Sequence, residues 1–207
     1  MRPTSARRRT RSTALAAAAL ALAVSLTGCT NAATGIAGQY EQGTNKGYIS
    51  GDGSVQEIPA AERGAALEFT GTAVDGSTVT AGDFAGDVVV LNFWYAGCGP
   101  CRVEAPILEE VNEATKDAGA HFLGVNIYDG PEQATSFEET YGITYPSLLA
   151  REDAALKLSF ASWVSLTSVP TTLVLDREGR VSARIIGAVQ SESILRTLVD
   201  DVLAETS

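Results

Sequence analysis

The feature that most constrains the fold is a Cys-x-x-Cys pair between an apolar run and a helical pattern. Residues 88–91, Val-Val-Val-Leu, form an unbroken segment that is typical of a strand buried on both faces. Cys98 and Cys101 follow it, and apolar residues then recur at spacings of three and four, which predicts an amphipathic helix. Because a helix N-terminus carries unpaired N–H groups and a positive dipole end, it favours the thiolate form of the first cysteine. The thiolate is the nucleophile, so we expect this pair to react.

The two residues between the cysteines fit the start of a helix. Gly99 and Pro100 suit a tight entry into the first turn, where proline loses no needed hydrogen bond, and beside Cys98 both are expected to contact the substrate. We expect Cys98, at the N-cap, to be the exposed attacking thiolate, and Cys101, one turn later, to be the shielded resolving thiol. The alternative is half of a zinc site, which needs two further ligands. The chain offers one histidine and one other cysteine, so a redox pair is favoured.

Residues 1–28 are predicted to be a secretory signal and not part of the fold. A basic region with five arginines precedes an apolar run over residues 14–26, which is shorter than a membrane span of about 20 residues. Residues 26–29, Leu-Thr-Gly-Cys, resemble a bacterial lipobox. That resemblance implies cleavage before Cys29, acylation of its thiol and a place on the extracytoplasmic face of the bacterial cell membrane. The alternative is an uncleaved signal anchor with an incidental cysteine.

Charge and cysteine usage exclude some classes of function. The whole chain has a net charge of −10, and removing residues 1–28 lowers it to −15, because five arginines and no acidic residues are lost. Binding to nucleic acid rests on neutralising phosphates with Lys and Arg, so nucleic acid is not an expected partner. An exported domain that used disulfides as staples would pair cysteines distant in sequence. A lone Cys-x-x-Cys closes a very small loop and stabilises a fold little, so this pair is expected to be reactive and not structural.

The remaining chain is predicted to hold a tether and one α/β domain. Residues 29–64 are mostly small and polar, which favours a flexible tether, although residues 55–58 could dock on the domain. The domain, residues 65–207, begins with a predicted β-hairpin over residues 67–80. The later elements are predicted as follows: strands at 87–94, 121–128, 172–176 and 181–186, a short extended piece at 145–149, and helices at 99–118, 131–141, 152–160 and from Ser191 onward, with Ile194 and Leu203 on its apolar face. This order predicts a mixed sheet covered by helices on both faces.

The stretch from Asn92 to Pro106 also carries a family resemblance. Its sequence, Asn-Phe-Trp-Tyr-Ala-Gly-Cys-Gly-Pro-Cys-Arg-Val-Glu-Ala-Pro, resembles the membrane-anchored thioredoxin-like proteins of the TlpA/ResA type. The resemblance covers roughly residues 65–205 and implies the thioredoxin fold, with residues 131–161 as the helical insertion of that branch. One position departs from the pattern, because thioredoxins usually carry Trp just before the first cysteine and this chain has Gly97. A docking surface built on that indole is therefore not expected.

The resemblance assigns roles to residues outside the cysteine pair. Glu104 lies three residues after Cys101 and so faces the same side of the helix, and in the similar proteins a glutamate here exchanges protons with the buried thiol. The alternative is an ordinary first-turn Glu that complements the helix dipole. Val169 and Pro170 match a cis-proline element whose preceding backbone pairs with an extended substrate chain; a trans proline bounding a strand is the alternative. Trp94 is expected either to shape the floor of the substrate site or to be plain core.

Together these features predict an extracytoplasmic, lipid-anchored thiol–disulfide oxidoreductase. The resemblance implies a reductant of protein disulfides, for example in apocytochrome c or copper-site proteins, that receives electrons from a membrane thiol carrier of the CcdA/DsbD kind. The Cys98–Cys101 disulfide is the redox group, and no other cofactor and no metal are expected. The alternatives are a disulfide-forming oxidase or a thiol peroxidase of the same fold, or a copper carrier that uses the cysteines as soft ligands. A peroxidase usually sets its cysteine in Pro-x-x-x-Thr-x-x-Cys, which is missing from this sequence.

Overall fold

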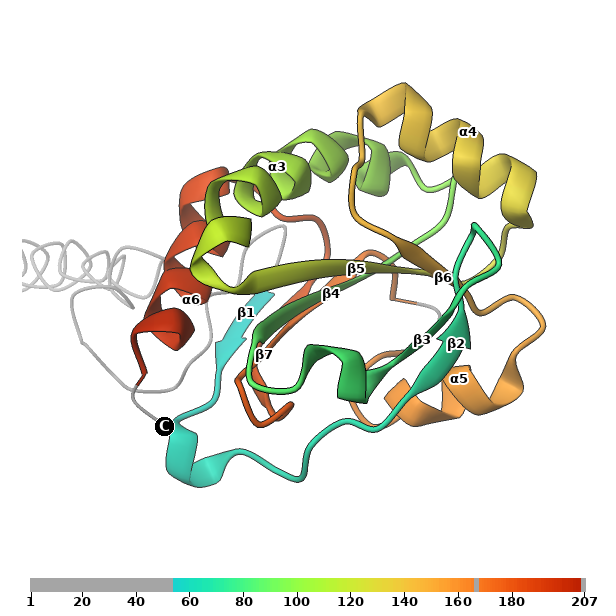
Figure 1. Ribbon diagram of the computed structural model, residues 1–207. Helices are drawn as coiled ribbons and strands as arrows, with labels where there is room; N and C mark the ends of the chain where they lie inside the picture. Colours follow the sequence, from blue (N-terminus) through green and yellow to red (C-terminus); the bar gives the residue numbers. More distant parts are fainter. Residues whose placement is uncertain (1–53, 166–167, 206–207) are drawn as a thin grey trace, which may run out of the picture. The chain divides into compact units, whose positions relative to one another are not determined.

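The computed structural model describes residues 54–165 and 168–205, which form a mixed sheet with helices on both faces (Figure 1). The sheet has the strand order β1-β8-β7-β4-β5-β6. The strands are β1 (Ser54–Glu57), β4 (Val88–Trp94), β5 (Ala120–Asn126), β6 (Ser147–Leu149), β7 (Thr171–Leu175) and β8 (Val181–Ile186). The central strand β4 runs parallel to β5 and antiparallel to β7, so the predicted mixed sheet is confirmed.

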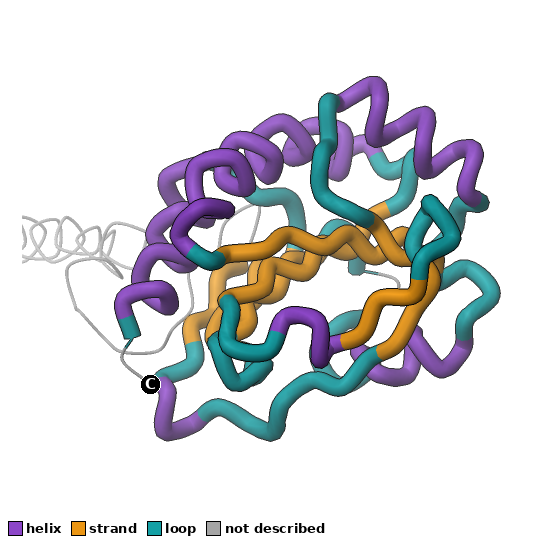
Figure 2. The backbone as a smooth tube through the Cα atoms, viewed as in Figure 1, coloured by secondary structure: helices purple, strands orange, loops and turns teal. Residues whose placement is uncertain are grey.

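Helices and a separate hairpin cover this sheet, as the tube drawing in Figure 2 shows. The helices are α3 (Gly99–Thr115), α4 (Pro131–Tyr141), α5 (Ala154–Phe160) and α6 (Glu192–Ala204). The strands β2 (Thr70–Thr72) and β3 (Thr78–Thr80) pair antiparallel and form the predicted hairpin. Among the described residues, no helix has the length and the apolar character that a membrane crossing requires.

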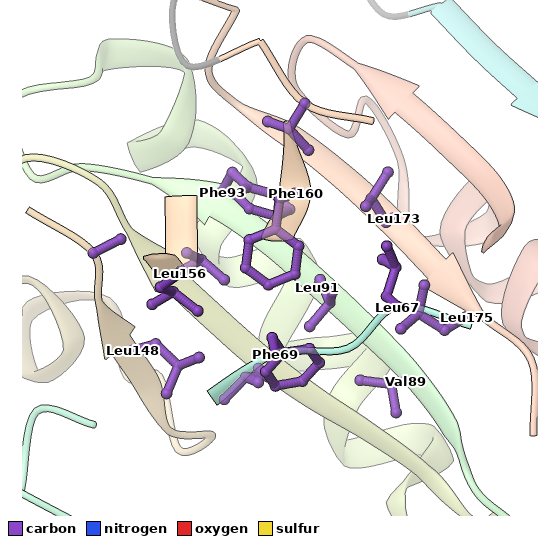
Figure 3. Close-up of a cluster of buried hydrophobic side chains, with 14 of the residues drawn as sticks. Leu67, Phe69, Val89, Leu91, Phe93, Leu148, Leu156, Phe160, Leu173 and Leu175 are labelled. Atoms are coloured by element: carbon purple, nitrogen blue, oxygen red, sulfur yellow. The ribbon is translucent and has the colours of Figure 1, made fainter. Parts of the chain in front are cut away.

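Alternation along β4 divides the core into two layers. Val88 and Val90 belong to a cluster with α3 and α6, whereas Val89, Leu91 and Phe93 belong to a cluster with α5 on the other face. The second cluster is drawn in Figure 3, where aromatic rings from three segments meet. Phe160 of α5 lies 5.0 Å from Phe93 and 5.5 Å from Phe69, measured between ring centroids. Asn92 and Trp94 are left to face the α3 side of the sheet, next to the cysteine pair.

The folded domain begins earlier than the sequence indicates. Ser54–Glu57 lies in the segment predicted as a tether, yet it forms the edge strand β1 and pairs antiparallel with β8, with Val55 opposite Ile185. The start of the domain therefore moves from residue 65 to Ser54 at the latest, and residues 55–58, whose docking the sequence left open, pack on the domain. The predicted signal, Cys29 and the rest of the predicted tether up to residue 53 lie outside the described residues.

Element ends follow local signals that were partly visible in the sequence. Helix α4 begins at Pro131 and ends just before Gly142, whose φ of 70° is the left-handed conformation that glycine tolerates best. Helix α3 ends at Thr115, three residues before the predicted end, because a 3₁₀ turn over Lys116–Ala118 follows it. Helix α6 is capped by Ser191, as predicted. Ile194, expected on its buried face, is 42% exposed.

Candidate active site

The two cysteines lie where β4 ends and α3 begins, and a disulfide bond joins them. Cys98 is the N-cap of α3, and its Sγ accepts a hydrogen bond from the Cys101 N–H at 3.2 Å. The S–S distance is 2.03 Å and the two Cα atoms are 5.3 Å apart. The cap holds Sγ at the positive end of the helix dipole, where a thiolate is stabilised after reduction. The pair predicted from the sequence is therefore present in its oxidised form.

Cys98 is less accessible than the sequence predicts. Its exposed fraction is 3%, against 1% for Cys101, so in the oxidised state both cysteines are buried. The expectation of an exposed Cys98 is not met, because the disulfide holds both sulfurs within one apolar cluster. The other buried members of this cluster are Trp94, Ala105, Ala134 and Phe137, and Val74, Tyr95 and Val169 pack against it. An incoming thiolate must displace part of this packing to reach Cys98 Sγ.

Glu104 is a buried carboxylate held by two hydrogen-bond donors. Its side chain is fully enclosed; Oε1 accepts from Asn92 Nδ2 and Oε2 accepts from the Val189 N–H, both at 2.8 Å. Burial raises the pKa of Glu104 to about 7, although the two hydrogen bonds act in the opposite direction. A carboxyl group with this pKa is partly protonated near neutral pH, so it can both give and take a proton. The first turn of α3 holds no acidic residue, so Glu104 is not the first-turn Glu of the alternative interpretation.

A small cavity lies beneath Cys101 and reaches Asn92, which donates a hydrogen bond to Glu104. Its volume is about 10 Å³, close to the smallest space that holds one water molecule. Cys101, Asn92 and Tyr145 are among its lining residues, together with apolar side chains of α3 and α4. Burial raises the pKa of Tyr145 well above its usual value, so its hydroxyl stays protonated. The resolving cysteine, Cys101, and the Glu104 partner Asn92 therefore line the same enclosed cavity.

The cis-proline element lies beside the cysteines, although it is far from them in sequence. The Val169–Pro170 peptide bond is cis, as predicted. Pro170 is buried, and its carbonyl oxygen accepts a hydrogen bond from the Gly187 N–H at 2.9 Å. Val169 is half-buried and packs against the cluster that contains both cysteines. Pairing between the Val169 backbone and a substrate chain stays a prediction.

The other predicted substrate contacts divide into surface and core. Gly99 and Pro100 open α3 and are exposed next to Cys98. Trp94 is 3% exposed, and its ring stacks on Phe137 with 4.3 Å between the centroids. Gly124 makes room for it, since a Cβ there would lie 2.8 Å from Trp94 Nε1. Trp94 is therefore a core residue of this site, and its indole offers no exposed face to a substrate.

Two side chains that are not among the predicted site residues, Asp129 and Arg102, hold the turn before Cys98. The Asp129 carboxylate accepts a hydrogen bond from the Ala96 N–H at 2.5 Å, and the Arg102 guanidinium donates to the Ala96 carbonyl at 2.7 and 2.9 Å. Asp129 comes three residues after Asn126, at the end of the strand beside β4. The available signal was an Asn-x-x-Asp sequence at the carboxyl end of that strand, where neighbouring parallel strands end side by side.

Metal ligands are sparse in the described part of the chain. Within residues 54–165 and 168–205, no three His, Cys, Asp or Glu side chains are grouped as a metal ion would require. Cys29, predicted to be acylated, lies outside these residues. The site itself brings together two sulfurs, a helix N-terminus and a buried carboxyl group.

Comparisons with known proteins agree with this geometry. The Redoxin family model matches residues 55–199. Over 133 residues, 64% of this chain and 74% of the relative, the sequence is 32% identical to the thiol–disulfide oxidoreductase ResA of Geobacillus kaustophilus. Among solved structures, a DsbF homologue from Corynebacterium diphtheriae is 31% identical with a TM-score of 0.63, covering 71% of this chain and 92% of that one.

A second similar structure is a secreted thiol-disulfide isomerase from Corynebacterium glutamicum. It is 30% identical with a TM-score of 0.62, and the match covers 70% of this chain and 92% of that one. The family match, the thioredoxin-like fold and the Cys98–Cys101 disulfide point to the same chemistry. The chain therefore belongs to the Redoxin family, as a thioredoxin-like thiol–disulfide oxidoreductase of the TlpA/ResA type.

Proposed function

We propose that this oxidoreductase is a lipid-anchored, extracytoplasmic reductant of protein disulfides. The substrates would be exported proteins whose thiols must stay reduced before they receive haem or copper, such as apocytochrome c. Electrons would come from a membrane thiol carrier of the CcdA/DsbD kind. The proposal is supported by the Gly-Pro pair between the cysteines, which resembles the reducing members of the superfamily, and by the signal-like N-terminus. A similar structure is described as secreted, which agrees with export.

The observation that carries the exchange chemistry of this proposal is the enclosed Glu104 carboxyl group, which is held by Asn92 and Val189 and whose pKa is raised by burial to about 7. Each turnover requires the buried Cys101 to lose a proton and later to regain it. Glu104 lies one helical turn after Cys101 on α3, and Asn92, which donates to it, lines the same cavity as Cys101. A carboxyl group that titrates near neutral pH can serve both steps.

The proposed reaction conserves sulfur, electrons and protons in two exchange steps. The Cys98 thiolate attacks one sulfur of the substrate disulfide; that S–S bond breaks, a mixed disulfide forms and the other substrate sulfur leaves as a thiolate. Cys101 then gives its proton to Glu104 and attacks Cys98 Sγ, which forms the Cys98–Cys101 disulfide and releases the second substrate thiolate. Two electrons have passed to the substrate, whose thiolates take protons from water and from Glu104. A donor dithiol reverses these steps and restores the reduced pair.

The equilibrium reduction potential of the Cys98–Cys101 pair tests the direction of electron flow. The full chain in detergent is equilibrated with buffers of defined thiol–disulfide ratio, and the oxidised fraction is measured by alkylation and mass spectrometry. A potential near the thioredoxin value of about −270 mV supports a reductant. A value of about −180 mV or above, as in protein disulfide isomerase or DsbA, overturns the proposed direction.

The lipid anchor needs its own test, because Cys29 lies outside the described residues. In bacterial cells, the wild-type chain should fractionate with membranes and carry a diacylglyceryl group on Cys29 by mass spectrometry. Cys29→Ala should lose this modification. An unmodified Cys29 in a chain that keeps its first 28 residues would contradict lipidation and support an uncleaved signal anchor.

A further inference from the structure

The turn that delivers Cys98 to the helix is held by charged side chains from two different elements. The turn runs from Tyr95 to Cys98 and is closed by a hydrogen bond from the Cys98 N–H to the Tyr95 carbonyl at 3.1 Å. Ala96 and Gly97 are its central residues, and Gly97 is exposed. The turn itself leaves the Ala96 N–H and the Ala96 carbonyl without a partner inside the turn.

Both polar groups of Ala96 are bound from outside the turn. On one side, Asp129 Oδ2 accepts from the Ala96 N–H at 2.5 Å. On the other side, Arg102 Nε and one terminal nitrogen donate to the Ala96 carbonyl at 2.9 and 2.7 Å. Arg102 belongs to the first turns of α3, whereas Asp129 follows β5. The turn is therefore fixed to the helix that Cys98 caps and to the strand beside β4.

Asp129 is itself held in place by a buried residue. Asn126, the last residue of β5, has no exposed surface; its Nδ2 donates to Asp129 Oδ2 at 2.9 Å and its Oδ1 accepts from the Asp129 N–H at 2.8 Å. Asn126 lies opposite Trp94 in the parallel ladder of β4 and β5, so the sheet sets its position. A ring contact between Tyr95 and Tyr128, 5.1 Å between centroids, joins the same two segments. The contacts that hold Ala96 are thus anchored on the central strands β4 and β5.

We propose that Arg102 and Asp129 are positioning residues that act through the Ala96 peptide to keep Cys98 at the helix N-cap. At this position Cys98 Sγ accepts a hydrogen bond from the Cys101 N–H and lies at the positive end of the helix dipole. Both features favour the thiolate over the thiol. Loosening the turn lets Cys98 move away from the cap, so its thiolate becomes less stable and its reactivity at neutral pH falls. The inference concerns thiol–disulfide exchange itself and holds for either direction of electron flow.

Positioning and simple charge effects predict opposite results at Asp129. The carboxylate is negative, so if it acted on the Cys98 thiolate only through its charge, removing it would lower the thiolate pKa. If it acts by holding Ala96, removing it raises that pKa. Asp129→Asn removes the charge but keeps a carbonyl oxygen that can accept from the Ala96 N–H. The pair Asp129→Ala and Asp129→Asn therefore separates the two explanations.

The experiment measures alkylation of Cys98 by iodoacetamide in the reduced full chain, as a function of pH, with the modified residue identified by mass spectrometry. We expect Asp129→Ala to raise the apparent thiolate pKa by about half a unit, in line with the size of helix-terminus interactions. In Asp129→Asn, the apparent thiolate pKa of Cys98 should be close to the wild-type value or below it. A lowered or unchanged pKa in Asp129→Ala would overturn the proposal.

A second test uses Arg102, which is exposed, so its result does not depend on how well the Asp129 variants fold. Arg102→Lys keeps the positive charge but lacks the planar fork that donates twice to one carbonyl. Positioning predicts a raised thiolate pKa in Arg102→Lys, whereas a charge effect alone predicts no change, and the latter result would overturn the proposal. The matched control is Arg196→Met, because Arg196 is a partly exposed arginine on α6 whose ion pairs are with Glu192 and Asp200 of the same helix. This variant should leave the pH profile of Cys98 alkylation unchanged.

Discussion

Glu104 shows how one enclosed side chain couples the chemistry of the site to its pH dependence. Its two oxygens accept from Asn92 and Val189, which favours the carboxylate, while burial favours the neutral acid. Burial is the larger effect, and the pKa of Glu104 is raised to about 7. The folded protein therefore holds a proton at this site in a pH range where the unfolded chain has released it.

Replacing Glu104 with glutamine should slow thiol–disulfide exchange and simplify its pH profile. The amide of Glu104→Gln cannot exchange protons with Cys101, so we expect the rate of disulfide reduction by dithiothreitol at pH 7 to fall about 100-fold, the lower end of general acid–base effects. The ionisation near pH 7 should also disappear from the rate profile. Stopped-flow fluorescence would follow the reaction. Glu110→Gln, on the exposed side of the same helix, is the control and should match the wild type.

The same pKa makes a prediction for stability. A carboxyl group whose folded pKa is raised from 4.5 to about 7 stabilises the fold fully below pH 4.5, and this contribution is lost as the pH rises through 7. The loss is about 3 kcal/mol, from about 1.4 kcal/mol for each pKa unit. Urea unfolding of the oxidised protein should show a fall of this order between pH 5 and pH 8. A slope that persists unchanged in Glu104→Gln would show that another group is responsible.

At the residue scale, the sequence predicts what lies in one contiguous motif and misses what the fold brings to it. Cys98, Cys101 and Glu104 share one helix, so their spacing alone places them together. One donor to Glu104 and the acceptor for the Ala96 N–H lie outside this motif: the Val189 N–H precedes α6, and Asp129 follows β5. No local pattern relates these positions to the cysteine motif, because the contact exists only after the sheet has formed.

At the scale of elements, periodic segments were predictable and the edge strand was not. Helix α4 was predicted at Pro131–Tyr141 and is found there, since proline opens it and its apolar residues repeat with helical spacing. Strand β1, Ser54–Glu57, is short and carries no continuous apolar pattern. It is an edge strand whose order comes from hydrogen bonds to β8, far along the chain, so its composition resembled a tether.

Helix α5 offers a matched pair of leucines that tests how this element is held. Leu156 is fully buried and packs closely on β2, where a Cβ on Gly71 would lie 2.9 Å from Leu156 Cδ2, whereas Leu158 is 75% exposed. We expect Leu156→Ala to lower the free energy of unfolding by about 2–5 kcal/mol, through lost burial and the cavity that remains. Leu158→Ala should change it by less than about 0.5 kcal/mol. Equal urea midpoints for the two variants would contradict this packing.

At the scale of the whole domain, one ionic cluster joins segments from both ends of the described chain. Arg63 follows β1, and its side chain is 4% exposed; it donates to Asp176 at 3.0 Å and makes two hydrogen bonds, of 2.5 and 2.6 Å, to Glu205 after α6. Asp176 also accepts from Arg180, at the turn between β7 and β8. The cluster lies outside the cysteine site, and it connects the start of the domain, the turn between β7 and β8, and the end of the domain.

Breaking this cluster should destabilise the domain without changing the chemistry of the cysteines. Arg63→Met leaves the buried Asp176 with Arg180 as its remaining partner. We expect a loss of stability below the roughly 3 kcal/mol of a buried charge left with no partner, because Arg180 still neutralises the carboxylate. Burial raises the pKa of Asp176, but bonds from Arg180 and Arg63 outweigh it and hold the pKa low; the Arg63 bond also lowers that of Glu205. These contributions are present above the usual carboxyl pKa values and are lost as the pH falls below them.

Thermal unfolding of the full chain from pH 3 to pH 7 would therefore show two effects of Arg63→Met. The variant should unfold at lower temperature at pH 7, and the difference from the wild type should shrink as the pH falls through the range in which Asp176 and Glu205 take up protons. Arg196→Met, which removes the surface ion pairs of Arg196 with Glu192 and Asp200 on α6, should change stability by less than about 1 kcal/mol. A difference that stays constant with pH would assign the role of Arg63 to packing of its side chain, because protonation of its partners would then have no influence on stability.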